Sequence, residues 1–205
     1  MKNTSLGAFT LIELLIVITI IAVLASIALP AFTGVKERGD QTKDLSNAKQ
    51  IALALRQFAI DNNGSYPSKP PAADYAAATG TPSNSNDAFW WLFPNYLQSQ
   101  FAYVSNLTDT SNPTFPLLTD GFVRTSPGTY TKDKSRTGGV WSGKKAVVVF
   151  CDSSGQLMNV NSATGKIPRA AGGTGASLFD NNSTDGSWLS TANIILNSDP
   201  PANAQ

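Results

Sequence analysis

The sequence contains no histidine and a single cysteine, and each shortage excludes a class of site. Histidine is the commonest general base and the commonest metal ligand in proteins, so its absence removes much of enzyme chemistry. Cys151 alone permits neither a disulfide nor a cysteine-built zinc site within one chain. No carboxylate pair at a telling spacing occurs. We therefore predict that the protein is not an enzyme.

Charge is also scarce, since charged residues make up 14% of the chain and hydrophobic residues 41%. Lys and Arg number 15 and Asp and Glu number 14, and loss of a leader that carries Lys2 would make the balance 14 against 14. A nucleic-acid-binding protein usually has a clear excess of basic residues. We therefore expect no nucleic acid among the partners.

One long hydrophobic run lies near the start of the chain. Residues Leu14 to Phe32 carry no charge, and their number suffices to cross the hydrocarbon core of a membrane as a helix. Lys2 precedes the run, and a positive charge on that side favours a cytoplasmic leader with the rest of the chain outside. Three interpretations fit: a secretory signal peptide cut near Ser26 and Ala28, a plain single-pass anchor, or an assembly helix.

Glu13 at the front of this run favours the third interpretation. A carboxylate at the edge of an apolar segment is costly in lipid and normally has a partner there, whereas a cleaved signal peptide has no use for it. The surrounding residues resemble the processing motif of type IV prepilins and type II secretion pseudopilins. They read Phe9-Thr10-Leu11-Ile12-Glu13-Leu14-Leu15.

The resemblance implies a specific maturation. A prepilin peptidase would cut before Phe9 and the new amino terminus would be methylated. Counted from Phe9, Glu13 is the fifth residue and Pro30 the twenty-second, which are the family's positions for an assembly glutamate and a helix-loosening proline. The family usually has Gly before the cut, and this chain has Ala8 there. Cleavage after Gly7 would make Glu13 sixth, so we favour cleavage after Ala8.

The resemblance also implies an architecture and partners. The expected parts are a leader over residues 1–8, a transmembrane or filament-core helix segment over 9–32, and a globular pilin-like domain over 33–205. The expected partners are further copies of the chain, the prepilin peptidase and an inner-membrane assembly platform. The expected place is the inner membrane, with the C-terminal domain outside the cytoplasm, followed by a periplasmic pseudopilus or a cell-surface filament.

Two functional alternatives remain open beside a secretion pseudopilus. One is a type IV pilin for adhesion, motility or DNA uptake. The other is a membrane-anchored binding domain that never polymerises. Many adhesive pilins close a C-terminal loop with a disulfide, which this chain cannot do with Cys151 alone. Together with the segment from Asp61 to Pro67, which looks like the helix end of the major pseudopilin, this favours the pseudopilin branch.

The pattern beyond Pro30 predicts an α+β fold, with the helix packed on a small antiparallel sheet. Apolar residues recur at spacings of three and four up to a helix end near Asn62: Leu45, Ala48, Ile51, Ala52, Leu55, Phe58 and Ala59. A helix from about Phe9 would be roughly 80 Å long at 1.5 Å per residue. The hairpin prediction is strongest for Ala146–Cys151 followed by Gln156–Val160.

Other elements are predicted with less pattern to support them. Gly128–Thr131 and Gly139–Ser142 are strand candidates, and 68–88 has the composition of a surface loop. Phe89–Phe93 is an aromatic cluster that we expect to form a short helix and to plug the core. Cys151, at the end of an apolar strand, is expected to be buried.

One oxygen-rich stretch near the C-terminus is a candidate cation site. The alternation of Asp180, Asn182 and Thr184, with Asp185 beside them, offers oxygen ligands of the kind that calcium prefers. Major pseudopilins are known for a calcium site in such a loop. The spacing does not match an EF-hand, and clusters of Asp, Asn, Ser and Gly usually form plain turns. Calcium is therefore a hypothesis and a turn is the alternative.

Overall fold

The computed structural model describes residues 9–68, 84–89, 92, 100–169, 176–182 and 188–198. The chain divides into two compact units, residues 1–42 and residues 43–205. Helix α1 contributes to both units, and each unit is described here by itself.

Helix α1 spans Leu11–Asp61, as the apolar periodicity predicted to within two residues at its start and one at its end. The helix ends because the residues that follow it adopt a left-handed backbone conformation. Asn63 and Gly64 have positive φ angles of 53° and 80°, and the Gly64 amide donates a 2.7 Å hydrogen bond to the carbonyl of Ala59. A glycine tolerates this left-handed turn without steric cost, so the chain can reverse there.

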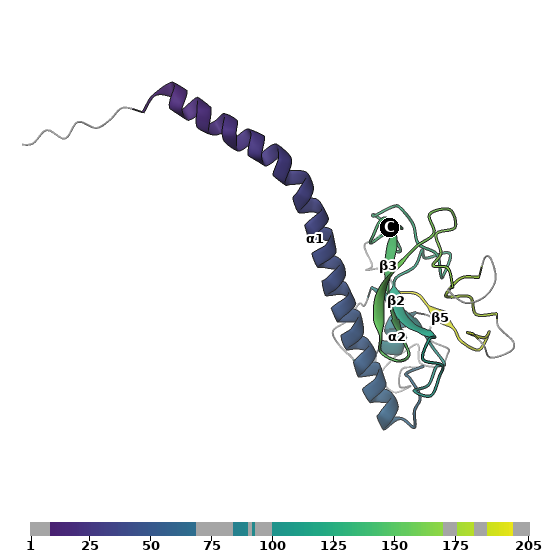
Figure 1. Ribbon diagram of the computed structural model, residues 1–205. Helices are drawn as coiled ribbons and strands as arrows, with labels where there is room; N and C mark the ends of the chain where they lie inside the picture. Colours follow the sequence, from purple (N-terminus) through teal and green to yellow (C-terminus); the bar gives the residue numbers. More distant parts are fainter. Residues whose placement is uncertain are drawn as a thin grey trace, which may run out of the picture. The chain divides into compact units, whose positions relative to one another are not determined.

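Five strands form one antiparallel sheet in the order β4-β3-β2-β1-β5 (Figure 1). The elements that follow α1 are α2 (Ser85–Phe89), β1 (Phe101–Val104), β2 (Pro116–Asp120), β3 (Lys145–Phe150), β4 (Gly155–Asn159) and β5 (Ile195–Leu196). The β3–β4 hairpin pairs Val147 with Leu157, and β2 pairs Leu118 with Val149. The predicted hairpin and the α+β class are confirmed.

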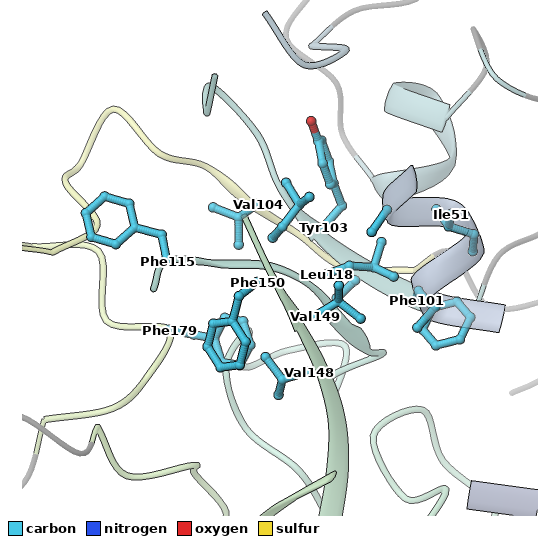
Figure 2. Close-up of a cluster of buried hydrophobic side chains, with 14 of the residues drawn as sticks. Ile51, Phe101, Tyr103, Val104, Phe115, Leu118, Val148, Val149, Phe150 and Phe179 are labelled. Carbon is cyan, nitrogen blue, oxygen red and sulfur yellow. The ribbon is translucent and has the colours of Figure 1, made fainter. Parts of the chain in front are cut away.

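The core of residues 43–205 lies between the second part of α1 and the sheet. Ala48, Ala52, Leu55 and Ala59 of α1 are fully buried, which confirms the predicted stripe, and Leu45 packs against the same cluster. Figure 2 shows Ile51 of the helix beside Phe101 of β1. Small alanine side chains at these positions let the helix backbone approach the strands closely.

Both faces of β3, an interior strand of the sheet, are covered. Five consecutive residues of β3 after Lys145 are buried, instead of every second one. Phe115, Phe150 and Phe179 belong to the same buried cluster, although Phe150 and Phe179 come from different parts of the chain, and Figure 2 shows Phe115 apart from the other two. A continuous apolar run is what a strand buried on both faces requires.

Two strand predictions were wrong. Gly128–Thr131 and Gly139–Ser142 lie in turns and irregular backbone, and not in the sheet. Gly128 and Ser142 have φ angles of 82° and 55°, and a backbone in that region cannot continue a strand. Strands β1, β2 and β5 were not predicted.

The aromatic cluster and the loop before it are described only in part. A short helix exists, but it ends at Phe89 instead of beginning there, and it occupies the end of the predicted loop 68–88. Phe89 is buried and its ring centroid lies 5.3 Å from that of Tyr103, in agreement with a core role. Trp90, Trp91 and Phe93, and residues 69–83, lie outside the described residues.

Candidate assembly segment

The first part of α1 has an apolar surface that no described residue of its own unit covers. Its large hydrophobic side chains are exposed from Phe9 to Val35, with exposed fractions such as 82% for Leu11 and 70% for Ile27. By length and composition the helix is apolar enough to cross a membrane, and its most apolar stretch is not buried. Water would solvate this surface poorly, so it calls for lipid or for another protein.

Three hydroxyl groups of this segment are satisfied within the helix. Three hydroxyls each donate to the carbonyl three residues earlier at 2.8–2.9 Å, and they belong to Thr19, Ser26 and Thr33. The helix continues through Pro30, which lacks an amide and so leaves one helical hydrogen bond unmade. The carbonyl of Pro30 accepts the hydroxyl hydrogen bond of Thr33. Such internal satisfaction suits a helix in lipid or in a dry filament core.

Glu13 lies in the first turn of α1 and forms a capping box with Thr10. Its Oε2 accepts hydrogen bonds from the backbone amide of Thr10 at 2.8 Å and from the Thr10 hydroxyl at 2.7 Å. The amide of Glu13 donates in turn to the Thr10 hydroxyl oxygen at 3.3 Å. A carboxylate at this position is also stabilised by the positive end of the helix dipole. Within a single chain, Glu13 thus stabilises the start of its own helix.

Among the described residues, Glu13 has no cationic partner. The side chain is exposed, and the one ion pair within the part of the chain that the structure describes joins Arg136 to Asp133. One oxygen, Oε2, receives both hydrogen bonds from Thr10. The carboxylate therefore has both the exposure and the charge to interact with a cation from outside the subunit.

The structure describes only part of the predicted processing site. Ala8 and the rest of the predicted leader lie outside the described residues. Phe9 is 75% exposed and lies two residues before the helix begins. A cut before Phe9 would leave the capping box intact, because Thr10 and Glu13 both remain in the mature chain.

Thr10 is the functional residue that the sequence prediction missed, although a signal for it was present. Thr10-Leu11-Ile12-Glu13 fits the pattern Ser/Thr-x-x-Glu, which marks a helix start when an apolar run follows. The sequence prediction interpreted Glu13 through its cost in lipid and its place in the prepilin-like motif. Its second property, the ability to cap the helix, was not considered.

The calcium candidates are not brought together by the described part of the structure. Asp180 is half-buried, with its amide donating to the carbonyl of Ser177 at 3.1 Å, and Asn182 is exposed. Thr184 and Asp185 lie outside the described residues. Among the residues that are described, no three His, Cys, Asp or Glu side chains are grouped so as to hold a metal ion. Calcium at this loop stays a hypothesis.

Comparison with known proteins gives a motif and a set of relatives. Residues 7–29 match the family model of the prokaryotic N-terminal methylation motif. The chain is 36% identical over 74 residues to the type II secretion system core protein G of Aeromonas hydrophila, which covers 36% of this chain and 51% of that protein. It is 32% identical over 92 residues to the protein of the same name from Klebsiella michiganensis, covering 39% and 65%.

A pilus protein is among the relatives as well. The chain is 38% identical over 84 residues to the type IV wide pilus major component of Thermus thermophilus, covering 41% of this chain and 62% of that protein. The chain thus spans about half the length of the curated relatives it matches. No solved structure matches it. The motif and the relatives thus make the chain similar to type IV pilins and pseudopilins, which are structural subunits and not enzymes.

Proposed function

We propose that this type IV pilin-like chain is a structural subunit of a filament, either a type II secretion pseudopilus or a related type IV pilus, and that it assembles through the first part of α1. One observation carries the proposal: an exposed, uncharged apolar helix with a single exposed carboxylate, Glu13, at its front. The similarity to core protein G of type II secretion systems favours the pseudopilus.

Maturation would precede assembly. A prepilin peptidase would remove residues 1–8 and leave a methylated Phe9, while the apolar segment holds the subunit in the inner membrane with residues 33–205 outside the cytoplasm. An assembly platform in that membrane would then move subunits into the filament. These partners and this location come from the family resemblance, which the methylation motif over residues 7–29 supports.

Glu13 would set the axial position of each subunit. In the filament the carboxylate would face the protonated amine of Phe9 on a neighbouring subunit. A charged pair in a dry core adds little net stability, because both groups lose their hydration, but one charge without the other is strongly unfavourable. Only subunits placed at the correct axial step satisfy the pair, so it selects register much as a buried polar residue does in a coiled coil.

Two substitutions separate this role from helix capping. Glu13→Ala removes both the charge and the cap, whereas Glu13→Gln removes the charge and keeps a side chain that suits the capping box. We expect both variants to reach the membrane at wild-type levels or better, because an intramembrane carboxylate has been removed. We expect neither to form filaments when expressed with the assembly machinery. Thr10→Val, which weakens the cap and keeps the charge, should still assemble.

Sheared filaments and membrane fractions, quantified by immunoblot, give the measurement. Normal filaments from Glu13→Gln would refute pairing through the charge, and normal filaments from both Glu13 variants would refute any assembly role for the residue. Loss of Glu13→Ala from the membrane would instead make Glu13 a residue for targeting or folding. A membrane-anchored binding domain that never polymerises predicts no filaments from the wild-type chain either.

A further inference from the structure

Basic side chains gather at one end of the sheet. Strand β2 ends at Asp120 and the antiparallel β3 begins at Lys145, so the segment 121–144 that joins them lies at that end. With the first residue of β3 it forms an exposed basic surface, made of Arg124, Lys132, Lys134, Arg136, Lys144 and Lys145. The one acidic residue of this stretch is Asp133, which forms an ion pair with Arg136 at 3.2 Å. The near-neutral balance of the whole chain therefore hides a local excess of positive charge.

The backbone of this segment folds back on itself and brings its cations together. The amide of Thr131 donates to the carbonyl of Gly138 at 2.9 Å, which closes the loop that carries three of them. Gly143 lies against the start of that loop, because a Cβ built on it would be 3.1 Å from the amide nitrogen of Lys132. A Cβ built on Gly138 would be 2.6 Å from the amide nitrogen of Val123, next to the first cation of the basic surface. Positive charges from three stretches of chain thus share one surface, which favours a partner of opposite charge.

The end of α1 is a negative surface at the opposite end of β2. The segment 105–115 joins β1 to β2 there, and the amide of its Asp109 donates a 2.8 Å hydrogen bond to the carbonyl of Gly64, just past α1. Asp61 and Asp109 are both exposed, and among the described residues neither forms an ion pair. The last turn of α1 contains no basic residue, and Arg56 is the nearest cation along the helix. The partial negative charge of the helix C-terminus therefore adds to the two carboxylates.

We propose that the basic surface of one copy binds the α1 end of the next copy, so that the globular units associate head to tail. Within one copy the two surfaces lie at opposite ends of the same strand, so a second copy is needed to join them. A contact between two different surfaces of identical chains is heterologous, and its repetition builds an open filament where the rotation does not close a ring. Exposed charges contribute little affinity and mainly set orientation. The inference rests on the proposed filament role, to which it adds a charged contact separate from the apolar part of α1.

Zero-length cross-linking tests this contact in the full chain. Isotope-labelled and unlabelled copies, purified separately, are mixed in detergent micelles, and a carbodiimide then joins lysine amines to the carboxylates that they touch. We expect mixed-isotope peptides that link the lysines of the basic surface to Asp61 or Asp109. Their yield should fall at least about threefold between about 0.1 M and about 1 M salt, because the Debye length falls from about 10 Å to about 3 Å.

Charge reversal tests the same contact in sheared filaments. The basic-surface reversal is Lys132→Glu, Lys134→Glu and Lys144→Glu, and the α1-end reversal is Asp61→Lys and Asp109→Lys. Each reversal alone should lower the filament yield at least about fivefold, because like charges then meet at the contact. A chain that carries both reversals has opposite charges at the contact again and should recover filaments. The matched control, in which the same three lysines become arginine, keeps the charge and should assemble as the wild type does.

The outcomes separate this contact from the filament role itself. Absence of mixed-isotope cross-links, wild-type filament yield from either reversal, or no recovery in the folded combined variant would overturn the proposal. If a reversal variant fails to fold, as near-ultraviolet circular dichroism would show, the cross-linking of the wild type decides. Protection of the same lysines by phosphatidylglycerol or by a DNA oligonucleotide, without cross-links between copies, would also overturn it and assign the basic surface to another polyanion. Cross-links in the expected pattern from a chain that forms no filaments would contradict the proposed function and leave the contact standing.

Discussion

Cys151 follows directly after β3, and its side chain is buried at the base of the β3–β4 turn. Burial raises the pKa of its thiol to about 12, with a further rise from the nearby charge of Asp152. The thiolate is the nucleophilic form, so the native thiol is expected to be inert. The sequence prediction of a buried cysteine is confirmed.

Alkylation of Cys151 checks this expectation. At pH 8 the thiolate fraction in the native chain should be roughly a thousandfold lower than in the unfolded chain, where the pKa is about 8.5. We therefore expect iodoacetamide to leave the folded protein unmodified and to label it rapidly in denaturant, as measured by intact mass. Equal labelling rates in the two states would show that the thiol is accessible and ionised.

Part of the role of Glu13 could be predicted from the sequence, and part of it could not. Its position in an apolar run identified it as a functional candidate, because a carboxylate there needs a reason. Its immediate partner was missed, since Thr10 lies outside the run and drew no attention by its own chemistry.

Helix α1 offers a direct test of its packing face within one turn. Leu55 is fully buried against the sheet, and Leu53 on the opposite side is 58% exposed. Leu55→Ala should lower the free energy of unfolding by about 2–5 kcal/mol, through lost burial and a residual cavity. Leu53→Ala should change it by no more than about 0.5 kcal/mol. Urea unfolding of both variants gives the comparison, and a similar cost for the two would contradict the assigned face.

Elements with a local pattern were predictable, and elements held by distant partners were not. The helix stripe and the β3–β4 hairpin repeat over several residues, so their periodicity is visible in the sequence. Strand β5 has two residues and exists through its pairing with β1, some 90 positions earlier in the chain. Strand β2 begins with Pro116 and contains a register shift, which hides its alternation. Burial of both β3 faces likewise follows from packing that no local window contains.

At the scale of the whole molecule, the apolar N-terminal segment and the longer remainder of the chain differ in length and in hydropathy. Residues 43–205 form a compact unit with its own core, while the first part of α1 exposes its apolar side chains. We expect the globular unit to fold alone and the first part of α1 to serve as a surface for association. The predicted boundaries at residues 8 and 32 stay predictions, as does the calcium loop at Asp180 and Asn182.

The mature N-terminus tests the central claim most directly, because it reports both processing and register. Intact-mass and N-terminal peptide analysis of the chain, co-expressed with a prepilin peptidase, should show a protein that begins at Phe9 and carries one added methyl group. A start at Ala8 would place Glu13 sixth and contradict the proposed register. An intact Met1, or a start after Ala28, would contradict the filament-subunit account and favour an anchor or a secretory signal peptide.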